Sequence, residues 1–248
     1  AARYAIYYAP PRDGALWVRG CRWLGRDPET GTSWQSPGWL APDDWHKLVA
    51  EPRRYGLHAT VKAPFHLASP TGEAAVEKEL ARICARHRPF LLPPLQLADN
   101  GGYLVLRPRT PDPRMDALAA DCLETFEPLR ARTGDAHRLQ RGGRARLNPR
   151  QRELVRHYGY PHCAERFRFH ITLTSRLSSR ARQQLAPMLR LLFAPVLHAQ
   201  RIPAHELAIF RQAHAGAPFE LTQRVGLGVA CPSGAERVDP TDVRESII

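Results

Sequence analysis

The chain contains 248 residues, of which 43% are hydrophobic and 24% are charged, as in an ordinary folded, water-soluble protein. This composition excludes a disordered tail, a collagen and a membrane protein, because no run approaches the ~20 apolar residues of a membrane helix. The formal net charge of +12 indicates an anionic ligand such as a phosphate ester, a nucleotide or RNA, although the preference for arginine over lysine is equally explained by a GC-rich coding bias.

The first half of the chain has alternating strand and helix patterns. It opens on a strand rich in aromatic residues that is closed by two prolines, with no apolar signal segment before it. Apolar residues near i, i+4 and i+8 spacing indicate the clearest helix. The patterns predict strands over 4–9, 57–65, 90–97 and 103–107, and helices over 15–24, from residue 42 and over 71–87.

The second half repeats this order, starting from the strand over 103–107. A basic, glycine-bearing loop over 134–146 separates two of its helices, and the residues from 233 onward are polar and irregular. The patterns predict helices over 115–132, 148–158 and 178–192, and strands over 167–174, 207–210 and 219–225.

The same element order occurs twice, which predicts a duplicated α+β fold. We expect a bilobal molecule with an internal pseudo-two-fold axis, an antiparallel sheet in each lobe, helices on the outer faces and an active-site cleft between the lobes. The predicted boundaries are 1–109 for the first lobe, 110–230 for the second and 231–248 for an irregular C-terminal tail.

One short motif occurs at the equivalent strand of each half. It reads His58-Ala59-Thr60-Val61 in the first half and His170-Ile171-Thr172-Leu173 in the second. Because strand side chains alternate between faces, each histidine shares a face with its threonine, and the apolar residues point to the opposite face. A pseudo-two-fold axis would bring the two polar faces together in one site.

Two facing imidazoles provide what cleavage of a phosphodiester requires. One takes a proton from the attacking water and the other gives a proton to the leaving oxygen, which makes His58 and His170 the candidate acid/base pair without specifying which is the base. The hydroxyls of Thr60 and Thr172 can bind the non-bridging oxygens. No metal or cofactor is needed.

The same strand alternation extends the site to three more residues. Lys62 is in phase with the first motif, and Arg168 and Thr174 are in phase with the second, so all three are candidate substrate-binding residues. The sequence leaves open the roles of four aromatic residues, Trp34, Trp39, Tyr158 and Tyr160.

The five cysteines are widely separated, odd in number and without a CxxC pair. This spacing disfavours a disulfide framework and a structural zinc site, and it favours a reducing, cytoplasmic setting. The sequence also lacks the Walker, GxGxxG and GxSxG motifs of nucleotide-hydrolysing, dinucleotide-binding and α/β-hydrolase proteins.

The paired motifs resemble the 2H phosphoesterase superfamily, which is defined by two His-x-Thr/Ser motifs in a bilobal duplicated fold. The flanking residues, over 55–65, 167–174, 208–212 and 217–219, look like the branch encoded in bacterial phosphonate-utilisation (carbon–phosphorus lyase) gene clusters. The resemblance covers about residues 3–228. It implies that His58 and His170 are the acid/base pair and that Thr60 and Thr172 are phosphate ligands.

The resemblance also implies a substrate class, the cyclic phosphodiesters of ribose. Phosphonate breakdown leaves a ribose 1,2-cyclic phosphate that carries a 5-phosphate, and this chain would open that ring to a monoester. Two alternatives remain: an enzyme that processes RNA 2′,3′-cyclic ends as phosphodiesterase or ligase, and a non-catalytic basic module that binds nucleotides or RNA. The expected partner is a small phosphate ester, with RNA as the alternative, no membrane and no obligate protein partner.

Overall fold

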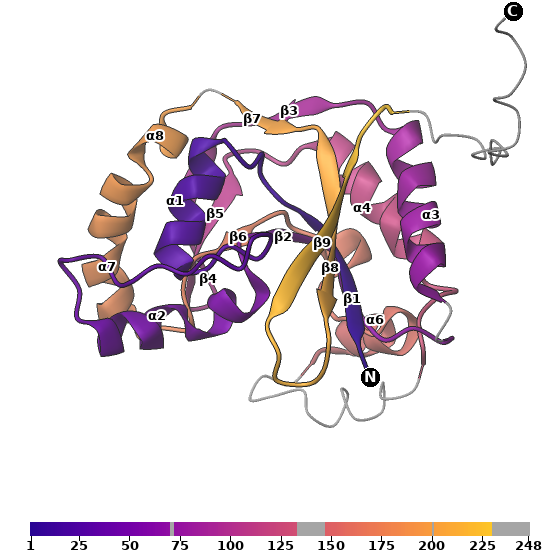
Figure 1. Cartoon of the computed structure of the whole chain (residues 1–248), viewed down its shortest axis with the longest axis horizontal. Helices are drawn as coiled ribbons and strands as arrows, with labels where there is room; N and C mark the ends of the chain where they lie inside the picture. Colours follow the sequence, from indigo (N-terminus) through magenta and orange to yellow (C-terminus); the bar gives the residue numbers. More distant parts are fainter. Residues whose placement is uncertain (70–71, 133–146, 200, 230–248) are drawn as a thin grey trace, which may run out of the picture.

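We describe a computed structural model that places residues 1–69, 72–132, 147–199 and 201–229 (Figure 1). Seven strands form one fully antiparallel sheet in the order β4-β5-β6-β2-β1-β8-β9. A separate two-stranded sheet pairs β3 with β7. The strands of the described chain are β1 (Arg3–Tyr8), β2 (Ala59–Phe65), β3 (Phe90–Leu92), β4 (Leu95–Asn100), β5 (Tyr103–Pro108), β6 (Ile171–Thr172), β7 (Ile202–Ala204), β8 (Glu206–Gln212) and β9 (Phe219–Gly226).

The helices lie in two groups at opposite ends of the sheet (Figure 1). Helices of the first group contact β4, β5 and β9, and helices of the second contact β2, β8 and β9. The first group is α1 (Ala15–Leu24), α2 (Pro42–Tyr55), α7 (Ser179–Leu192) and α8 (Ala194–Leu197), and the second is α3 (Gly72–Arg86), α4 (Pro113–Thr125) and α6 (Pro149–Tyr158). No helix of the described residues combines the length and apolar character that crossing a membrane requires.

Local chemistry fixes the ends of several helices. The side chain of Asn148 accepts from the backbone N–H of Gln151, whose own side chain accepts from the backbone N–H of Asn148, forming a capping box at the start of α6. Gly25 ends α1 with φ +74°, a left-handed conformation that glycine adopts without the steric cost of a side chain. The observed α1 has the predicted bounds 15–24.

The strand order reveals the internal two-fold axis. Exchanging β1 with β5, β2 with β6 and β4 with β8 converts the six-strand order β4-β5-β6-β2-β1-β8 into its own reverse. The same exchange maps the β3–β7 pair onto itself, because β3 precedes β4 and β7 precedes β8 along the chain. The structure therefore confirms the α+β class with antiparallel strands and agrees with a duplicated chain.

The two halves of the sequence exchange elements across this axis. β6, from the second predicted lobe, pairs with β5 and β2 of the first, and β8, also from the second, pairs with β1 of the first. The predicted boundaries at 1–109 and 110–230 therefore do not separate the two ends of the sheet, because each end contains strands from both halves of the sequence. The tail predicted over 231–248 lies outside the described residues.

Candidate active site

The two His-x-Thr motifs lie side by side at the centre of the sheet. Ala59 of β2 and Ile171 of β6 are register partners on antiparallel strands. That register places His58 next to Thr172 and Thr60 next to His170, with all four side chains on the face opposite to Ala59 and Ile171. His170 also acts electrostatically on the His58 ring and lowers its pKa, which agrees with their proximity. The juxtaposition predicted from the repeated motif is therefore present.

Both imidazoles are held in the same way. The Nδ1 of His58 donates to the backbone carbonyl of Gly56 at 2.8 Å, and the Nδ1 of His170 donates to the carbonyl of Arg168 at 2.7 Å. A carbonyl oxygen only accepts, so each bond places a hydrogen on Nδ1. This arrangement fixes the orientation of each ring and directs its Nε2 away from the backbone carbonyl.

The structure gives a contact to one of these nitrogens for Thr60 and a strand partner for Thr172. The hydroxyl oxygen of Thr60 lies 3.3 Å from the Nε2 of His58. Thr172 is half-buried and pairs with Val105 of β5. Their roles as phosphate ligands remain a prediction.

Aromatic side chains surround His58, which the sequence pattern did not indicate. Its ring stacks on Tyr7 of β1, with 3.8 Å between ring centroids and 22° between planes. Tyr55 and Phe210 approach it with centroid distances of 6.0 and 6.1 Å. Burial lowers the pKa of His58 to about 4; the Gly56 carbonyl bond opposes this shift, and the charge of His170 adds to it. His58 is therefore neutral in the folded protein at neutral pH.

Tyr160, whose role the sequence leaves open, lies near two other tyrosines. Tyr160 and Tyr55 both act electrostatically on the hydroxyl of Tyr7, so the three phenols lie near one another. Burial raises the pKa of Tyr160 to about 12, which keeps its hydroxyl protonated. Tyr158 instead donates to Glu124 of α4 at 2.5 Å.

The two tryptophans left open by the sequence belong to the segment between α1 and α2. Trp39 is 46% exposed and stacks on Trp23 at 6.2 Å between ring centroids. Trp34 is half-buried and packs against the main core.

The prediction that Lys62 binds substrate is wrong. Tyr7 pairs with Thr60 and Ile6 pairs with Lys62, so one step along β1 matches two steps along β2. The extra residue is a β-bulge at Val61, which inverts the alternation and turns Lys62 away from the face of Thr60.

On that opposite side, the Lys62 side chain is 2% exposed and enclosed by α4 and the segment that follows it. Its ammonium group donates to the Leu123 carbonyl at 3.1 Å and to the Glu127 carboxylate at 3.0 Å. Arg130 is 2.7 Å from the other carboxylate oxygen of Glu127. Burial lowers the pKa of Lys62, while the carboxylate of Glu127 opposes that shift. Lys62 therefore belongs to a buried ionic cluster that ties β2 to this segment.

The prediction that Thr174 binds substrate is also wrong. Thr174 is fully buried, and its hydroxyl accepts the backbone N–H of Leu104 at 3.0 Å. The side chain thus continues the β5–β6 pairing at the point where β6 ends. Arg168 is exposed, and its guanidinium donates to the carbonyls of Glu165 and Phe167. Its role in substrate binding remains a prediction, and the arginine-rich segment 138–146 lies outside the described residues.

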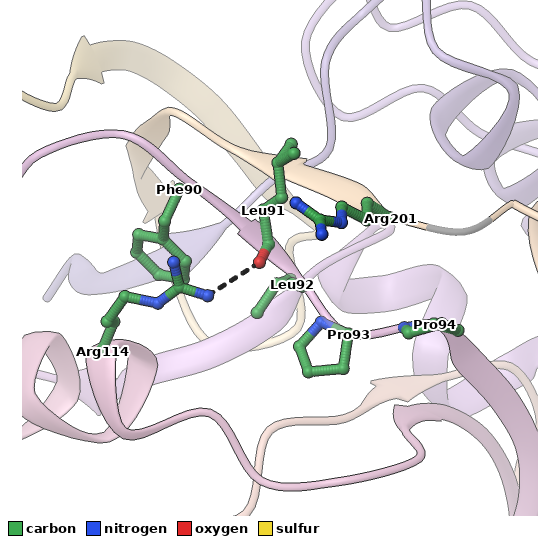
Figure 2. Close-up of a pocket in the computed structure, with 7 residues that line it drawn as sticks. All are labelled: Phe90, Leu91, Leu92, Pro93, Pro94, Arg114 and Arg201. Carbon is green, nitrogen blue, oxygen red and sulfur yellow. Dashed lines mark hydrogen bonds between the residues drawn. The ribbon is translucent and has the colours of Figure 1, made fainter.

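A separate depression of about 580 Å³ lies along β3, and none of its lining residues belongs to either motif (Figure 2). Arg114 lies over the Phe90 ring, 4.8 Å from its centroid, and donates to the Leu91 carbonyl at 2.9 Å. Arg201 comes from the segment before β7. The described residues contain no group of three or more His, Cys, Asp or Glu side chains arranged to hold a metal ion.

Comparison with known proteins gives a family and several relatives. A family model described as "Protein of unknown function (DUF1045)" matches residues 60–220. Two curated relatives, both named ribose 1,5-bisphosphate phosphokinase PhnN, come from Laribacter hongkongensis and Janthinobacterium sp. (strain Marseille). The first is 36% identical over 233 residues, covering 92% of this chain and 52% of the relative. The second is 32% identical over 229 residues, covering 90% and 50%.

The chain therefore spans about half the length of the curated relatives it matches. Among solved structures it is similar to Escherichia coli LigT complexed with 3′-AMP, with 15% identity, 91% of this chain and 97% of that chain covered, and a TM-score of 0.41. Because the family model covers well over half of the residues, the chain belongs to the DUF1045 family.

Proposed function

We propose that this protein is a metal-independent phosphodiesterase that opens a small phosphoribosyl cyclic phosphate by two-histidine acid/base catalysis. The observation that carries the proposal is the register of the two motifs. It sets His58 and His170 on one face of adjacent strands, each with Nδ1 bound to a carbonyl and Nε2 left for the substrate. This geometry suits a phosphorus atom held between the two Nε2 atoms.

The chemistry follows from that placement. One imidazole takes a proton from the attacking water while the other protonates the oxygen that leaves phosphorus. Each well-placed acid or base contributes on the order of 10²–10⁴-fold to the rate. The Thr60 hydroxyl lies 3.3 Å from the His58 Nε2, and the strand register places Thr172 next to His58. Both hydroxyls would bind the non-bridging oxygens, where the charge of the transition state is spread.

The names of the two relatives support the phosphoribosyl class of substrate. Both are named as kinases of ribose 1,5-bisphosphate, and the chain matches about half of each. Adding water to ribose 1,2-cyclic phosphate 5-phosphate with cleavage of the bond between phosphorus and O2 leaves a phosphate on O1. The product is ribose 1,5-bisphosphate, so ring opening would supply the compound in those names.

RNA with a 2′,3′-cyclic end is the alternative substrate, and the net charge of +12 favours it. Binding to a phosphate backbone depends on neutralisation by basic side chains. The chemistry at the two histidines would be the same. What differs is the portion of the ligand beyond the cyclic phosphate.

A product assay tests the proposal. The protein is incubated with ribose 1,2-cyclic phosphate 5-phosphate and, separately, with an oligonucleotide that ends in a 2′,3′-cyclic phosphate, and phosphorus NMR follows ring opening. We expect the ribose compound to turn over faster and a His58→Ala/His170→Ala double variant to be inactive. Faster turnover of the oligonucleotide would select the RNA alternative. Binding of either ligand without turnover would identify a non-catalytic module.

A further inference from the structure

The two motifs share register and anchoring, but their surroundings differ. His58 lies against the ring of Tyr7, which is 1% exposed, and near Phe210, which is fully buried. Among the described residues, no ring contact of this kind is found for His170. The fold is nearly symmetric about this site, so the aromatic surroundings of one histidine distinguish the two.

We propose that His58 is the general base and His170 the general acid of the reaction, and that Tyr7 is the positioning residue that fixes this division of labour. The inference rests on the proposed function, since it assigns roles within that chemistry. A general base must be neutral in the resting enzyme, and a general acid must carry a proton that it can give up. The aromatic surroundings favour the neutral form at only one of the two sites.

Two opposing effects act on the protonated form of His58, a cation–π contact and the loss of hydration, and their free energies show which is larger. Stacking an imidazolium on the Tyr7 ring would gain about 0.5–2 kcal/mol as a cation–π contact. Removing a charged ring from water without an anionic partner costs several kcal/mol. The loss of hydration is the larger effect, so His58 stays neutral and its Nε2 remains a proton acceptor. The low pKa of about 4 has the same principal cause, burial.

The groups that face His58 do not offset this effect. They are Tyr7 from β1, Tyr55 from α2 and His170 from the segment before β6. Two phenols and an imidazole carry no negative charge near neutral pH, so none of these three would stabilise an imidazolium. Arg3 and Tyr160 act in turn on the Tyr7 hydroxyl, and they bring no anion to it near neutral pH.

The proposed step balances as follows. The Nε2 of His58 takes one proton of the attacking water as the water oxygen bonds to phosphorus. The bond from phosphorus to the leaving ring oxygen breaks, and the Nε2–H of His170 protonates that oxygen. His58 ends protonated and His170 neutral, and proton exchange with solvent restores both. No oxidant, reductant or cofactor takes part.

A change of leaving group separates the two roles. An aryl diester that releases 4-nitrophenolate needs no protonation of its leaving oxygen, whereas the alcohol released from a cyclic ribose phosphate does. We therefore expect His170→Ala to lose on the order of 10²–10⁴-fold in kcat on the cyclic substrate and to stay within about tenfold of wild type on bis(4-nitrophenyl) phosphate. His58→Ala should lose on the order of 10²–10⁴-fold on both, because each reaction needs the base.

The reverse pattern, in which the aryl ester rescues His58→Ala and not His170→Ala, would overturn the assignment. Equal losses on both substrates for both variants would also overturn it. If the wild-type protein cleaves neither diester, the proposed function itself fails. That outcome is distinct from both patterns because it appears before any variant is compared.

The role of Tyr7 is tested separately, through the pH dependence of kcat/KM. Tyr7→Phe keeps the ring and serves as the matched control for Tyr7→Leu, which removes it. We expect the acid limb of the kcat/KM profile to move to higher pH in Tyr7→Leu and to stay in place in Tyr7→Phe. A purely structural role would lower activity without moving the limb, and an unmoved limb would overturn this assignment. Should Tyr7→Leu fail to fold, histidine NMR titration of the wild type decides: His58 must titrate well below the ordinary range of a histidine, and an ordinary value overturns the proposal.

Discussion

Ala59 and Ile171 face each other across the centre of the sheet as fully buried register partners, and the internal two-fold axis passes between them. Each is the middle residue of a His-x-Thr motif. The same pair thus holds the two strands together on the core side and sets the spacing of the polar groups on the other side. The first prediction follows from this arrangement.

Replacing either motif histidine should nearly abolish hydrolysis. We expect His58→Ala and His170→Ala each to lower kcat by on the order of 10²–10⁴-fold, because each removes one proton-transfer group. Steady-state kinetics on the cyclic substrate measures the effect, and circular dichroism verifies the fold. His214 is exposed and lies outside both motifs, so His214→Ala is the matched control and should keep wild-type activity. Near-normal turnover in either motif variant would contradict the acid/base assignment.

Lys62→Met should affect stability rather than substrate binding. The substitution leaves Glu127 with one of its cationic partners missing in a buried setting, at a cost of about 3 kcal/mol. Urea denaturation measures the loss, and KM should stay within about twofold of wild type, since the bulge turns Lys62 away from Thr60. Lys47, with its side chain 76% exposed, provides the control substitution Lys47→Met. A large rise in KM with unchanged stability would contradict this prediction and show that Lys62 binds substrate.

Thr174→Val and Thr172→Val form a contrasting pair. Thr174→Val leaves the backbone N–H of Leu104 without its acceptor in the core, which should cost about 1–3 kcal/mol and leave kcat near wild type in the folded fraction. Thr172→Val removes a hydroxyl beside the imidazoles and should lower kcat with little change in stability. Thermal unfolding and kinetics on both variants distinguish the two effects. The same loss of kcat in both would show that Thr174 also serves the reaction.

The folded protein should lose stability as the pH falls below about 6.5. The folded-state pKa of His58 is about 4, below the ordinary value of a histidine in the unfolded chain. Above pH ~6.5 both states are neutral at this ring and the full stability is present. Between pH ~6.5 and ~4 only the unfolded chain takes up the proton, which costs the fold up to ~3 kcal/mol.

Urea denaturation of wild type and His58→Gln across this pH range measures that dependence. The difference in unfolding free energy between the two proteins should change steadily from pH 7 to pH 4, because the variant lacks the titrating ring. A constant difference over that range would show that His58 titrates normally in the folded state.

Hydrolysis should survive dialysis against EDTA. Imidazoles, rather than a metal-bound water, activate the nucleophile in the proposed step. We expect kcat and KM to remain at their untreated values after the chelator is removed. Loss of activity that Zn²⁺ or Mn²⁺ restores would identify a metallohydrolase instead.

The parts of the fold that depend on local chemistry could be predicted from the sequence. The bounds of α1 agree with the expectation because a glycine ends it, and Asn148-Pro149 marks the start of α6. The meeting of the two motifs could also be predicted, because a repeated His-x-Thr in equivalent strands needs only a two-fold relation to place four side chains together.

The wrong assignments of Lys62 and Thr174 and the missed contact of Tyr7 each have a physical cause that lies outside the local pattern. Alternation along a strand holds only while the register is continuous, and the bulge at Val61 breaks it, so Lys62 points the other way. Thr174 lies beyond the end of β6, where its hydroxyl replaces a backbone acceptor in the core. The stacking of Tyr7 on His58 depends on β1 pairing with β2, and no local pattern states which strands will pair.

The pairing of β1 with β8 also determines when the protein can complete its fold during synthesis. Arg3 lies opposite Gln212, so the N-terminal strand emerges from the ribosome roughly 200 residues before one of its two neighbours exists. Closing so long a loop is entropically unfavourable, and sheets with distant partners form slowly. The aromatic strand beneath His58 therefore has an open edge until β8 has been synthesised, and a chaperone that shields this edge would raise the yield of folded protein.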